Sequence, residues 1–406
     1  MKKNISIVRQ ETIPGGWDIE AHKLWLHGKK NDAIQLLLKS INATPGQEPP
    51  KLLQQFAYYL FLLNDFKTTM PVLNRILQIN PQDVDAKLNL AVCNSRLGSF
   101  VKALEIYEAL SLEVPNKFEV WTGLAYCQSK LGHKIEASVA GTKCLNIKDS
   151  LAELVDARWA LPKEKPGQFA FAKKKVIAFS LFGSEPRYLR GGLHNILMAK
   201  DIYPDWVCRF YVDGTVPKEF LEAAKSLGAE LIVRPDHQSL ADKLGWRFAV
   251  ANDLGVGYFM VRDADSVINT REKIAVTEWL ASEHYFHVMR DWWSHTELIL
   301  AGMWGGVAGI LPSIEALKKN YRSSIMETPN ADQIFLRDVI WPYVRQSVCV
   351  HDRYFDVAGA KKLSEPASSD SFHIGQNEFA ARPREQANFL MERLGKLKCL
   401  KFDVTR

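Results

Sequence analysis

Residues 258–266 read Tyr258-Phe259-Met260-Val261-Arg262-Asp263-Ala264-Asp265-Ser266, an apolar run that ends in two carboxylates. The apolar half is typical of a buried strand, and open α/β sheets bind ligands beyond the carboxyl ends of their strands. In extended backbone the side chains of residues i and i+2 point to the same side. Asp263 and Asp265 are therefore candidates to hold one hard divalent cation, which would neutralise a diphosphate. The alternative is that the pair only caps a turn or the next helix.

Three strand-like segments precede this stretch, and helix-like segments separate them. The expected strands are 176–181, 206–212 and 230–233, and the expected helices are 190–199, 218–227 and 243–253. Strands that alternate with helices predict βαβ units, in which the strands of a sheet run mainly parallel. We therefore expect an α/β, Rossmann-like domain whose fourth strand is the opening stretch.

The first third of the chain repeats itself every 34 residues. The residues that keep this spacing are small or turn-forming: Ala57, Ala91 and Ala125; Gly98 and Gly132; Pro81 and Pro115. Each unit has the pattern of two amphipathic helices that pack closely through their small residues. This pattern resembles the tetratricopeptide repeat family over four units, residues 18–150, with departures at Asn64 and Thr69. The resemblance implies an all-α solenoid.

The repeat family is a curved scaffold that usually binds a segment of a partner protein in its groove. Two alternatives stay open: the repeats brace the second domain, or they form a contact between two copies of the chain, a homo-oligomer. Prolines and a glycine interrupt a basic stretch, 161–175, which we expect to be a linker. The expected domains are 1–160 for the repeats, 176–380 for the α/β domain and 381–406 for the tail.

The composition is that of an ordinary soluble globular protein, with 47% hydrophobic and 24% charged residues. A net charge of +6 gives little support to a nucleic-acid partner, which needs a concentrated basic face. Residues 1–10 lack the apolar segment of a secretory signal, and the apolar run 298–311 is too short to span a bilayer. The six cysteines form no Cys-x-x-Cys pair, which fits free thiols in a reducing compartment. We expect a cytoplasmic protein.

Glycine-rich nucleotide loops do not occur in this sequence. Neither Gly-x-Gly-x-x-Gly after the first strand nor Gly-x-x-x-x-Gly-Lys is present, which disfavours dinucleotide-dependent oxidoreductases and P-loop NTPases. Ser180 and Asp213 nevertheless fall at predicted strand ends, as Asp263 does. The Asp213 carboxylate is a candidate acceptor for a ribose or a base, and a turn role before Gly214 is an equal alternative.

Several segments together resemble the GT-A fold glycosyltransferases of the polysaccharide type. In addition to 262–266, these segments are 180–183, 203–206, 209–211, 271–272, 278–279, 289–291, 301–306, 332–333 and 351–352. The similarity covers residues 174–375. It implies the transfer of a sugar from a nucleotide-sugar donor to a glycan, lipid-linked or protein acceptor.

The resemblance also implies roles for single residues on the donor side. Asp263 and Asp265 would hold Mn²⁺ or Mg²⁺ on the donor diphosphate and so stabilise the leaving nucleotide. Arg247 and Arg262 are further candidates for donor binding, because a guanidinium matches phosphate oxygens in bidentate geometry. The alternative for both arginines is a structural ion pair, and we favour the donor role only for Arg247. Ser180 and Asp213 complete the expected donor side.

On the acceptor side we expect the segment that contains Gly302, Trp304, Gly305 and Gly306. Glycine lets a sugar approach the backbone, and tryptophan offers an apolar face to a sugar ring. A tightly packed core turn is the alternative for so apolar a segment.

Three residues complete the predicted site. Asp291 follows a predicted strand and is the first candidate for the base that an inverting enzyme needs. Asp332 is a second candidate, although it competes with a role as the N-cap of the helix through Val339. His373 is the candidate third metal ligand, with His351 as its competitor, and an imidazole suits Mn²⁺ better than Mg²⁺.

The C-terminal tail, 381–406, has the pattern of a basic amphipathic helix. Such a helix can bind the anionic inner face of a membrane, which would suit a lipid-linked acceptor. We prefer the alternative that its apolar face packs on its own domain.

Two other functions compete with an active glycosyltransferase. One is a non-catalytic tetratricopeptide scaffold with a degenerate nucleotide-sugar-binding domain. The other is a nucleotidyltransferase, which needs a basic phosphate loop after the first strand. Residues 180–185 contain no lysine or arginine, so we rank this function last.

Overall fold

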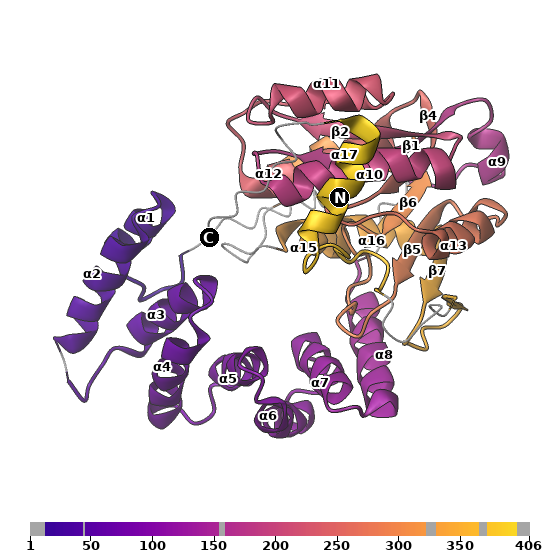
Figure 1. Cartoon of the computed structure of the whole chain (residues 1–406). Helices are drawn as coiled ribbons and strands as arrows, with labels where there is room; N and C mark the ends of the chain where they lie inside the picture. The colour runs from indigo at the N-terminus through magenta and orange to yellow at the C-terminus, as the bar shows by residue number, and fades with distance from the viewer. Residues whose placement is uncertain (1–12, 44, 154–158, 322–329, 365–371, 396–406) are drawn as a thin grey trace, which may run out of the picture. The chain divides into compact units, whose positions relative to one another are not determined.

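The chain folds into two units, which are described separately (Figure 1). The structure is a computed structural model that describes residues 13–43, 45–153, 159–321, 330–364 and 372–395. The described residues up to Ser150 form a helical unit, and those from Leu151 onward form an α/β unit. The division falls at the end of the last predicted repeat.

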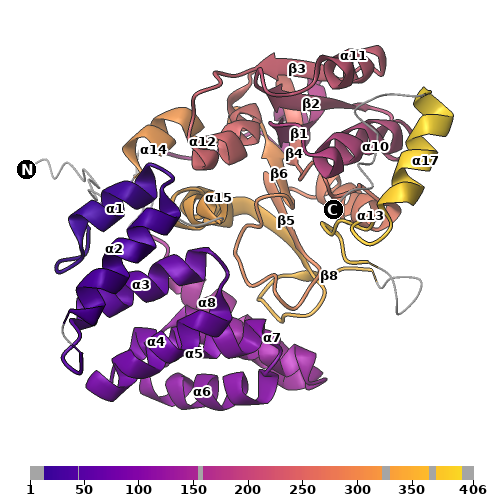
Figure 2. The same cartoon turned by 60° about the vertical axis from the view of Figure 1, so that its left-hand side comes forward.

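Eight helices in four consecutive pairs make up the helical unit (Figure 2). They are α1 Ile19–Leu26, α2 Lys30–Asn42, α3 Pro50–Leu62, α4 Phe66–Ile79, α5 Val84–Arg96, α6 Phe100–Glu113, α7 Phe118–Lys130 and α8 Lys134–Ser150. Each pair occupies one of the predicted repeat units. The predicted all-α repeat architecture is therefore confirmed in this part of the chain.

Small residues and left-handed turns explain why the pairs repeat. The alanines of the ladder are at most 5% exposed: Ala21, Ala57, Ala91 and Ala125. The turn within a pair has a positive φ at Gly28, Gly98 and Gly132, where glycine has no steric penalty. Asn64 takes the same place in the second pair with φ 58°, a conformation that asparagine tolerates better than most residues. The departure from the family pattern at this position is thus accommodated.

An eight-stranded sheet forms the centre of the α/β unit. Its strands are β1 Lys174–Leu181, β2 Trp206–Val212, β3 Glu230–Val233, β4 Val256–Val261, β5 Phe286–Arg290, β6 Trp304–Val307, β7 Val348–Asp352 and β8 Lys361–Lys362, in the order β3-β2-β1-β4-β6-β5-β7-β8. Among the described strands only β6 runs antiparallel, between β4 and β5. The predicted mainly parallel sheet is confirmed, and all six residues of β4 are buried.

Helices connect the strands of this sheet. They are α9 Pro166–Phe169, α10 Pro186–Ile202, α11 Lys218–Ser226, α12 Leu240–Leu244, α13 Thr270–Leu280, α14 Ile314–Asn320, α15 Ala331–Phe335, α16 Trp341–Val344 and α17 Pro383–Leu394, with the 3-10 helices η1 Gly245–Asn252 and η3 Arg345–Ser347 and the π-helix η2 Leu336–Ile340. The predicted helix 243–253 is thus the end of α12 followed by η1. The predicted linker 161–175 contains α9 and the first residues of β1.

The basic helix of the tail, α17, packs against α10 in both views (Figures 1 and 2). Its buried residues are Gln386, Ala387 and Leu390. The preferred prediction, that this helix packs on its own domain, is confirmed for residues 383–394. This apolar face is therefore not available to a membrane. In the described parts of the chain, no helix combines the length and the apolar character that crossing a bilayer requires.

Candidate functional site

The two aspartates of the opening stretch lie in a turn directly after β4. The buried side chain of Asn195 on α10 holds this turn, because its Nδ2 donates to the carbonyl oxygens of Ala264 at 3.2 Å and Ser266 at 2.8 Å. The backbone N–H of Ser266 also donates to the carbonyl of Asp263 at 3.2 Å. The turn that carries Asp263 and Asp265 is thus positioned by a helix and not only by its own strand.

A glycine of the same helix makes this close approach possible. A Cβ atom at Gly191 would lie 2.2 Å from the carbonyl oxygen of Ala264 and 2.7 Å from the Cα of Asp265. Such distances are far inside van der Waals contact, so any larger residue would push the turn away from α10.

Arg247 brings three of the predicted site residues together. It lies on η1 and is 3% exposed. Its Nη1 donates to the Asp263 carboxylate and, at 3.1 Å, to the carbonyl of Arg262, and its Nη2 lies 3.2 Å from the Asp332 carboxylate. The Asp263 side chain is still 45% exposed. Arg247 therefore holds one side of an accessible carboxylate, and its partners in this structure are two carboxylates and a backbone carbonyl.

Asp265 lies close enough to Asp263 for the two charges to interact. Burial, and then the negative charge of Asp263, raise the pKa of Asp265, while Arg187 and Asn377 oppose the shift. The Arg187 Nε lies 3.9 Å from the Asp265 carboxylate, and the Arg187 side chain is 57% exposed. Two carboxylates that repel each other in a partly buried turn fit the oxygen chemistry of a hard divalent cation, which would relieve this repulsion.

The predicted third metal ligand, His373, does not join this pair. Its ring stacks on Trp292, with centroids 5.2 Å apart, and lies edge-on to His295, and its Nδ1 is 2.9 Å from the carbonyl oxygen of Ile374. Over the described residues, no group of three or more His, Cys, Asp or Glu side chains is placed to hold a metal ion. In the described structure His373 is therefore not placed with Asp263 and Asp265.

The competitor, His351, belongs to a different buried network. Its Nδ1 lies 2.9 Å from the Nε2 of His287, and its Nε2 lies 3.1 Å from the Glu278 carboxylate. Burial lowers the pKa of both histidines. We assign His351 to the packing of β5 and β7 and not to the aspartate pair.

Asp332 lies next to the site but is not the N-cap of its helix. Asn330 occupies the N-cap position of α15, and Asp332 stands in the first turn, where one oxygen accepts from the backbone N–H of Gln333 at 2.9 Å. Burial raises the pKa of Asp332, Arg247 opposes this shift, and Asp263 adds to it. A carboxyl group with a raised pKa beside the aspartate pair remains a candidate for acid–base chemistry.

Asp291, the first candidate for the base, is not an accessible carboxylate in this structure. This side chain is completely buried, and Arg271 grips both of its oxygens, with Nη1 at 2.8 Å and Nη2 at 3.0 Å. The backbone N–H of Ile374 donates to the same carboxylate at 2.7 Å. Asp291 is thus a buried anchor that ties β5 to the segment after Phe372.

The glycine- and tryptophan-containing segment is mostly core. Trp304 is completely buried between Phe248 and Phe259, because β6 is inserted between β4 and β5. A Cβ at Gly305 would lie 2.5 Å from the carbonyl of Phe259, and one at Gly306 would meet aromatic rings. In this structure these three residues belong to the core, which is the alternative that the sequence left open for this segment.

Gly302 differs from them because it lies at the site itself. A Cβ at this position would be 2.1 Å from a carboxylate oxygen of Asp263. Glycine is thus required here so that the loop before β6 can lie against Asp263, which is a different reason from the one predicted.

The other predicted donor residues have structural partners. Arg262 is 1% exposed, with Nε 3.2 Å from Glu272, so it is a core ion pair and leaves no guanidinium for a phosphate. The Ser180 hydroxyl donates to the carbonyl of Leu244 at 3.1 Å and accepts from the backbone N–H of Arg247 at 3.1 Å. Ser180 thereby joins β1 to η1 and positions Arg247 rather than a ligand.

Asp213 is likewise engaged. Its carboxylate is completely buried and accepts from Lys243 at 2.6 Å and from the backbone N–H of Thr215 at 3.1 Å. Burial alone would raise the pKa of Asp213, but the hydrogen bonds from Lys243 and Thr215 outweigh it, and the pKa is lowered. Asp213 therefore positions Lys243.

Sequence reasoning missed an aromatic corner at the ends of β1 and β2. Phe182 and Trp246 pack edge to face, 5.9 Å apart, and the Lys243 ammonium lies 5.6 Å and 5.8 Å from their ring centroids. Phe182 follows a predicted strand and could have been noticed. Lys243 and Trp246 give no local signal, because they reach this corner only through the turn from α12 into η1.

Comparison with known proteins bears on the helical unit. A profile of the tetratricopeptide repeat family matches residues 60–137. The N-terminal region contains tetratricopeptide repeats. The profile begins in the last residues of α3 and covers α4, the third helix pair, α7 and the start of α8, so it lies within the repeats that the 34-residue spacing predicted.

Solved structures of other tetratricopeptide repeat proteins are similar to about a third of this chain. MamA from Desulfovibrio magneticus RS-1 is 16% identical, with a TM-score of 0.30, and the match covers 32% of this chain and 72% of that one. YrrB, described as a TPR protein with an unusual peptide-binding site, is 19% identical, with a TM-score of 0.29 over 31% of this chain and 64% of that one. No curated protein sequence matches the chain.

Proposed function

We propose that the α/β unit transfers a sugar from a nucleotide-sugar donor to a hydroxyl of a glycan, lipid-linked or protein acceptor. The observation that carries this proposal is the aspartate pair at the carboxyl end of the central strand β4. Arg247 holds the Asp263 carboxylate, the side chains of Asp263 and Asp265 are 45% and 20% exposed, and the charge of Asp263 acts on Asp265. A mainly parallel sheet that opens at this edge is the usual setting for a nucleotide.

The residues present fit a divalent cation, Mn²⁺ or Mg²⁺, held by Asp263 and Asp265. When bound, the cation neutralises charge on the donor diphosphate as the sugar departs. Arg247 keeps Asp263 oriented through an ion pair, and Asn195 keeps the turn in place. Arg187, which is largely exposed beside Asp265, supplies a guanidinium that suits a phosphate oxygen.

The aromatic corner supports the same proposal from the donor side. Phe182 and Trp246 offer flat apolar surface, and Lys243 offers an ammonium, at the ends of β1 and β2. A nucleobase stacks well on such surface, because its π face packs against an aromatic ring. In this arrangement the nucleobase of the donor lies at the aromatic corner, and its diphosphate lies at the aspartate pair.

In this proposal Asp332, and not Asp291, is the catalytic base that accepts the proton of the acceptor hydroxyl. It touches Arg247, and its carboxyl pKa is raised. The tetratricopeptide repeats, in this proposal, recruit a protein partner or the acceptor to the enzyme.

A non-catalytic nucleotide-sugar-binding scaffold is the second candidate. One observation favours it: Arg247 occupies one side of Asp263, so a cation must compete with a buried arginine for that carboxylate. This candidate predicts binding of nucleotide without turnover.

Release of nucleoside diphosphate from a panel of nucleotide sugars, with and without Mn²⁺, tests the proposal. We expect metal-dependent release from one donor class in the wild-type protein, its loss in Asp263→Ala, and no change in Asp205→Asn. Asp205 is the matched control because its side chain is 80% exposed in the turn before β2. Full activity in Asp263→Ala would refute the metal assignment, and binding without release would favour the scaffold.

A further inference from the structure

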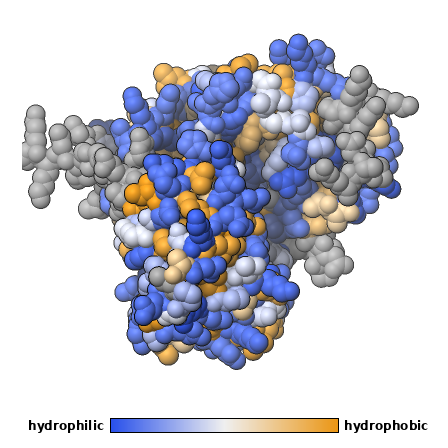
Figure 3. Space-filling model, turned by 90° about the vertical axis from the view of Figure 1, so that its left-hand side faces the viewer, coloured by the Kyte–Doolittle hydropathy of each residue, from blue (hydrophilic) through white to orange (hydrophobic). Residues whose placement is uncertain are grey.

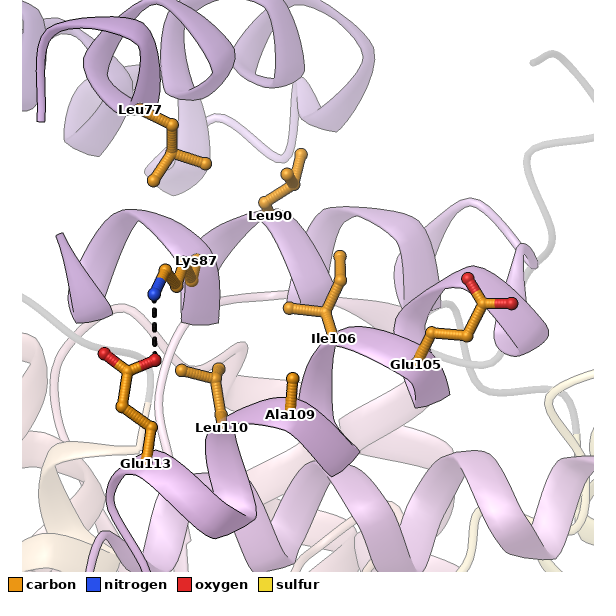
Figure 4. A pocket seen from close by; sticks show the side chains of 8 residues that line it. All are labelled: Leu77, Lys87, Leu90, Glu105, Ile106, Ala109, Leu110 and Glu113. Atoms are coloured by element: carbon orange, nitrogen blue, oxygen red, sulfur yellow. Dashed lines mark hydrogen bonds and ion pairs between the residues drawn. The ribbon is translucent and has the colours of Figure 1, made fainter. Parts of the chain in front are cut away.

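A groove of about 350 Å³ opens on the helical unit between α4, α5 and α6 (Figure 4). Its apolar floor is made by Leu77, Leu90, Ile106 and Leu110. Its volume is at the lower end of the range for ligand pockets, about 300–1,000 Å³, so it has room for a large apolar side chain. It lies wholly within the helical unit and does not depend on sugar transfer by the other unit.

The repeat pattern explains why the groove forms in the third repeat. Lys87 on α5 occupies the position four residues before the ladder alanine. The equivalent residues of the other repeats are apolar and pack in the cores: Trp17, Leu53 and Trp121. A lysine cannot fill that place with its charged end, so the floor beneath it stays open.

The charged end of Lys87 goes to the other helix of its pair. Its ammonium meets the Glu113 carboxylate at 2.8 Å across one end of the groove (Figure 4). Residues one repeat before and after Glu113 are again apolar, Ile79 and Ile147. The third repeat thus has an ion pair where the neighbouring repeats have apolar residues, and its two side chains remain partly exposed, at 24% and 35%.

The opposite end of the groove carries a carboxylate that is not neutralised. Glu105 is exposed, and within the described residues it meets no hydrogen-bond or ion-pair partner. One helical turn after the lining residue Ala109, Leu112 is 86% exposed. Figure 3 shows one face of the helical unit, on which apolar residues lie among hydrophilic ones. Apolar surface next to an unpaired negative charge selects a ligand that is apolar and positive.

We propose that this groove binds a segment of a partner protein in which a large apolar side chain neighbours a lysine or arginine. The apolar side chain lies on the floor formed by Leu77, Leu90 and Leu110. The basic side chain pairs with Glu105. Leu112 extends the apolar contact beyond the groove. The Lys87–Glu113 ion pair closes the other end, so the segment has one favoured orientation.

Selection of random displayed peptides on the full-length protein tests this proposal. We expect the enriched peptides to pair leucine, methionine or phenylalanine with lysine or arginine. Their synthetic, fluorescein-labelled forms are then titrated against variants by anisotropy. Lys87→Trp, which restores the residue type of the first and fourth repeats, should fill the groove and raise Kd about tenfold or more.

The charge is tested separately. Glu105→Lys should raise Kd about three- to tenfold, with the effect shrinking at high salt. Glu136→Lys makes the same charge change on an exposed residue of α8 that does not line the groove, and it should leave Kd unchanged. Lys87→Leu provides a second filling variant, and circular dichroism shows whether each variant folds.

Three results would overturn the proposal. The first is peptides that bind Lys87→Trp as tightly as wild type, because they occupy another surface. The second is no enrichment, or enrichment of acidic peptides. The third is a wild-type dimer in sedimentation that Lys87→Trp converts to a monomer, because the occupant is then a second copy of the chain.

Discussion

Acidification should loosen the contact between α10 and α17 through a single buried histidine. His194 of α10 is 5% exposed and lies between the rings of Phe379 and Phe389, with centroids 5.2 Å and 4.5 Å away. Its Nδ1 lies 3.4 Å from the side-chain amide of Gln386. Burial, and then the charge of Arg393, lower the pKa of His194 from 6.5 to about 4.

The sign and size of the effect follow from proton linkage. The unfolded chain binds a proton at this residue below about pH 6.5, and the folded chain does so only below about pH 4. Stability is therefore lost as the pH falls between these values. From pH 7 to pH 5 the free energy of unfolding should drop by about 2 kcal/mol on account of His194. His287 and His295 shift in the same direction and add to the total.

The contribution of His194 to this loss of stability is measured with His194→Asn, whose side chain stays neutral and can still accept a hydrogen bond. Urea-dependent hydrogen exchange of the β1 and β2 amides, measured at pH 7 and pH 5, reports unfolding of the α/β unit. The variant should lose about 2 kcal/mol less than the wild type between these pH values. His237→Asn, at an exposed position of the same unit, is the matched control and should lose as much as the wild type. Equal losses in His194→Asn and wild type would refute the reasoning.

Two other substitutions test the packing around the site. Gly191→Ala places a methyl group 2.2 Å from the carbonyl oxygen of Ala264, so it should weaken the binding of Mn²⁺ with nucleotide about tenfold. Gly15→Ala is the control, because its methyl group meets nothing within 4 Å, and it should leave this affinity unchanged. An unchanged affinity of Gly191→Ala in calorimetry would show that the turn does not need α10. Glu272→Gln leaves the buried Arg262 charge unpaired and should lower the free energy of unfolding by about 3–5 kcal/mol, measured in urea. The double variant Arg262→Met with Glu272→Leu should recover most of this stability. A loss below about 1 kcal/mol in Glu272→Gln would contradict the buried ion pair.

Local patterns in the sequence were sufficient for the repeats and for the first half of the sheet. The 34-residue spacing of Ala57, Ala91 and Ala125 reflects contacts between neighbouring helices, which are close in sequence. The strands up to β4 follow one another as βαβ units, so their order and the position of Asp263 could be predicted. These features depend on periods of a few residues to a few tens of residues.

The second half of the sheet could not be predicted in this way. β6 is inserted antiparallel between β4 and β5, which buries Trp304 and Gly305 in a segment that was expected to line the acceptor site. Asp291 follows a strand as predicted, but its carboxylate forms an ion pair with Arg271, which lies twenty residues earlier on α13. A carboxylate in an open site and a carboxylate in a buried ion pair have the same local sequence signal, and only tertiary structure separates them.

The central claim is that Asp263 and Asp265 together hold the cation of a bound nucleotide. Electron paramagnetic resonance of free Mn²⁺ measures this directly, with the protein titrated in the presence of a nucleoside diphosphate and a matching titration without protein. The wild-type chain should take up about one additional Mn²⁺ per chain, and Asp265→Asn should take up none at the same concentrations. Equal uptake by wild type and variant, or no uptake by either, would contradict the claim.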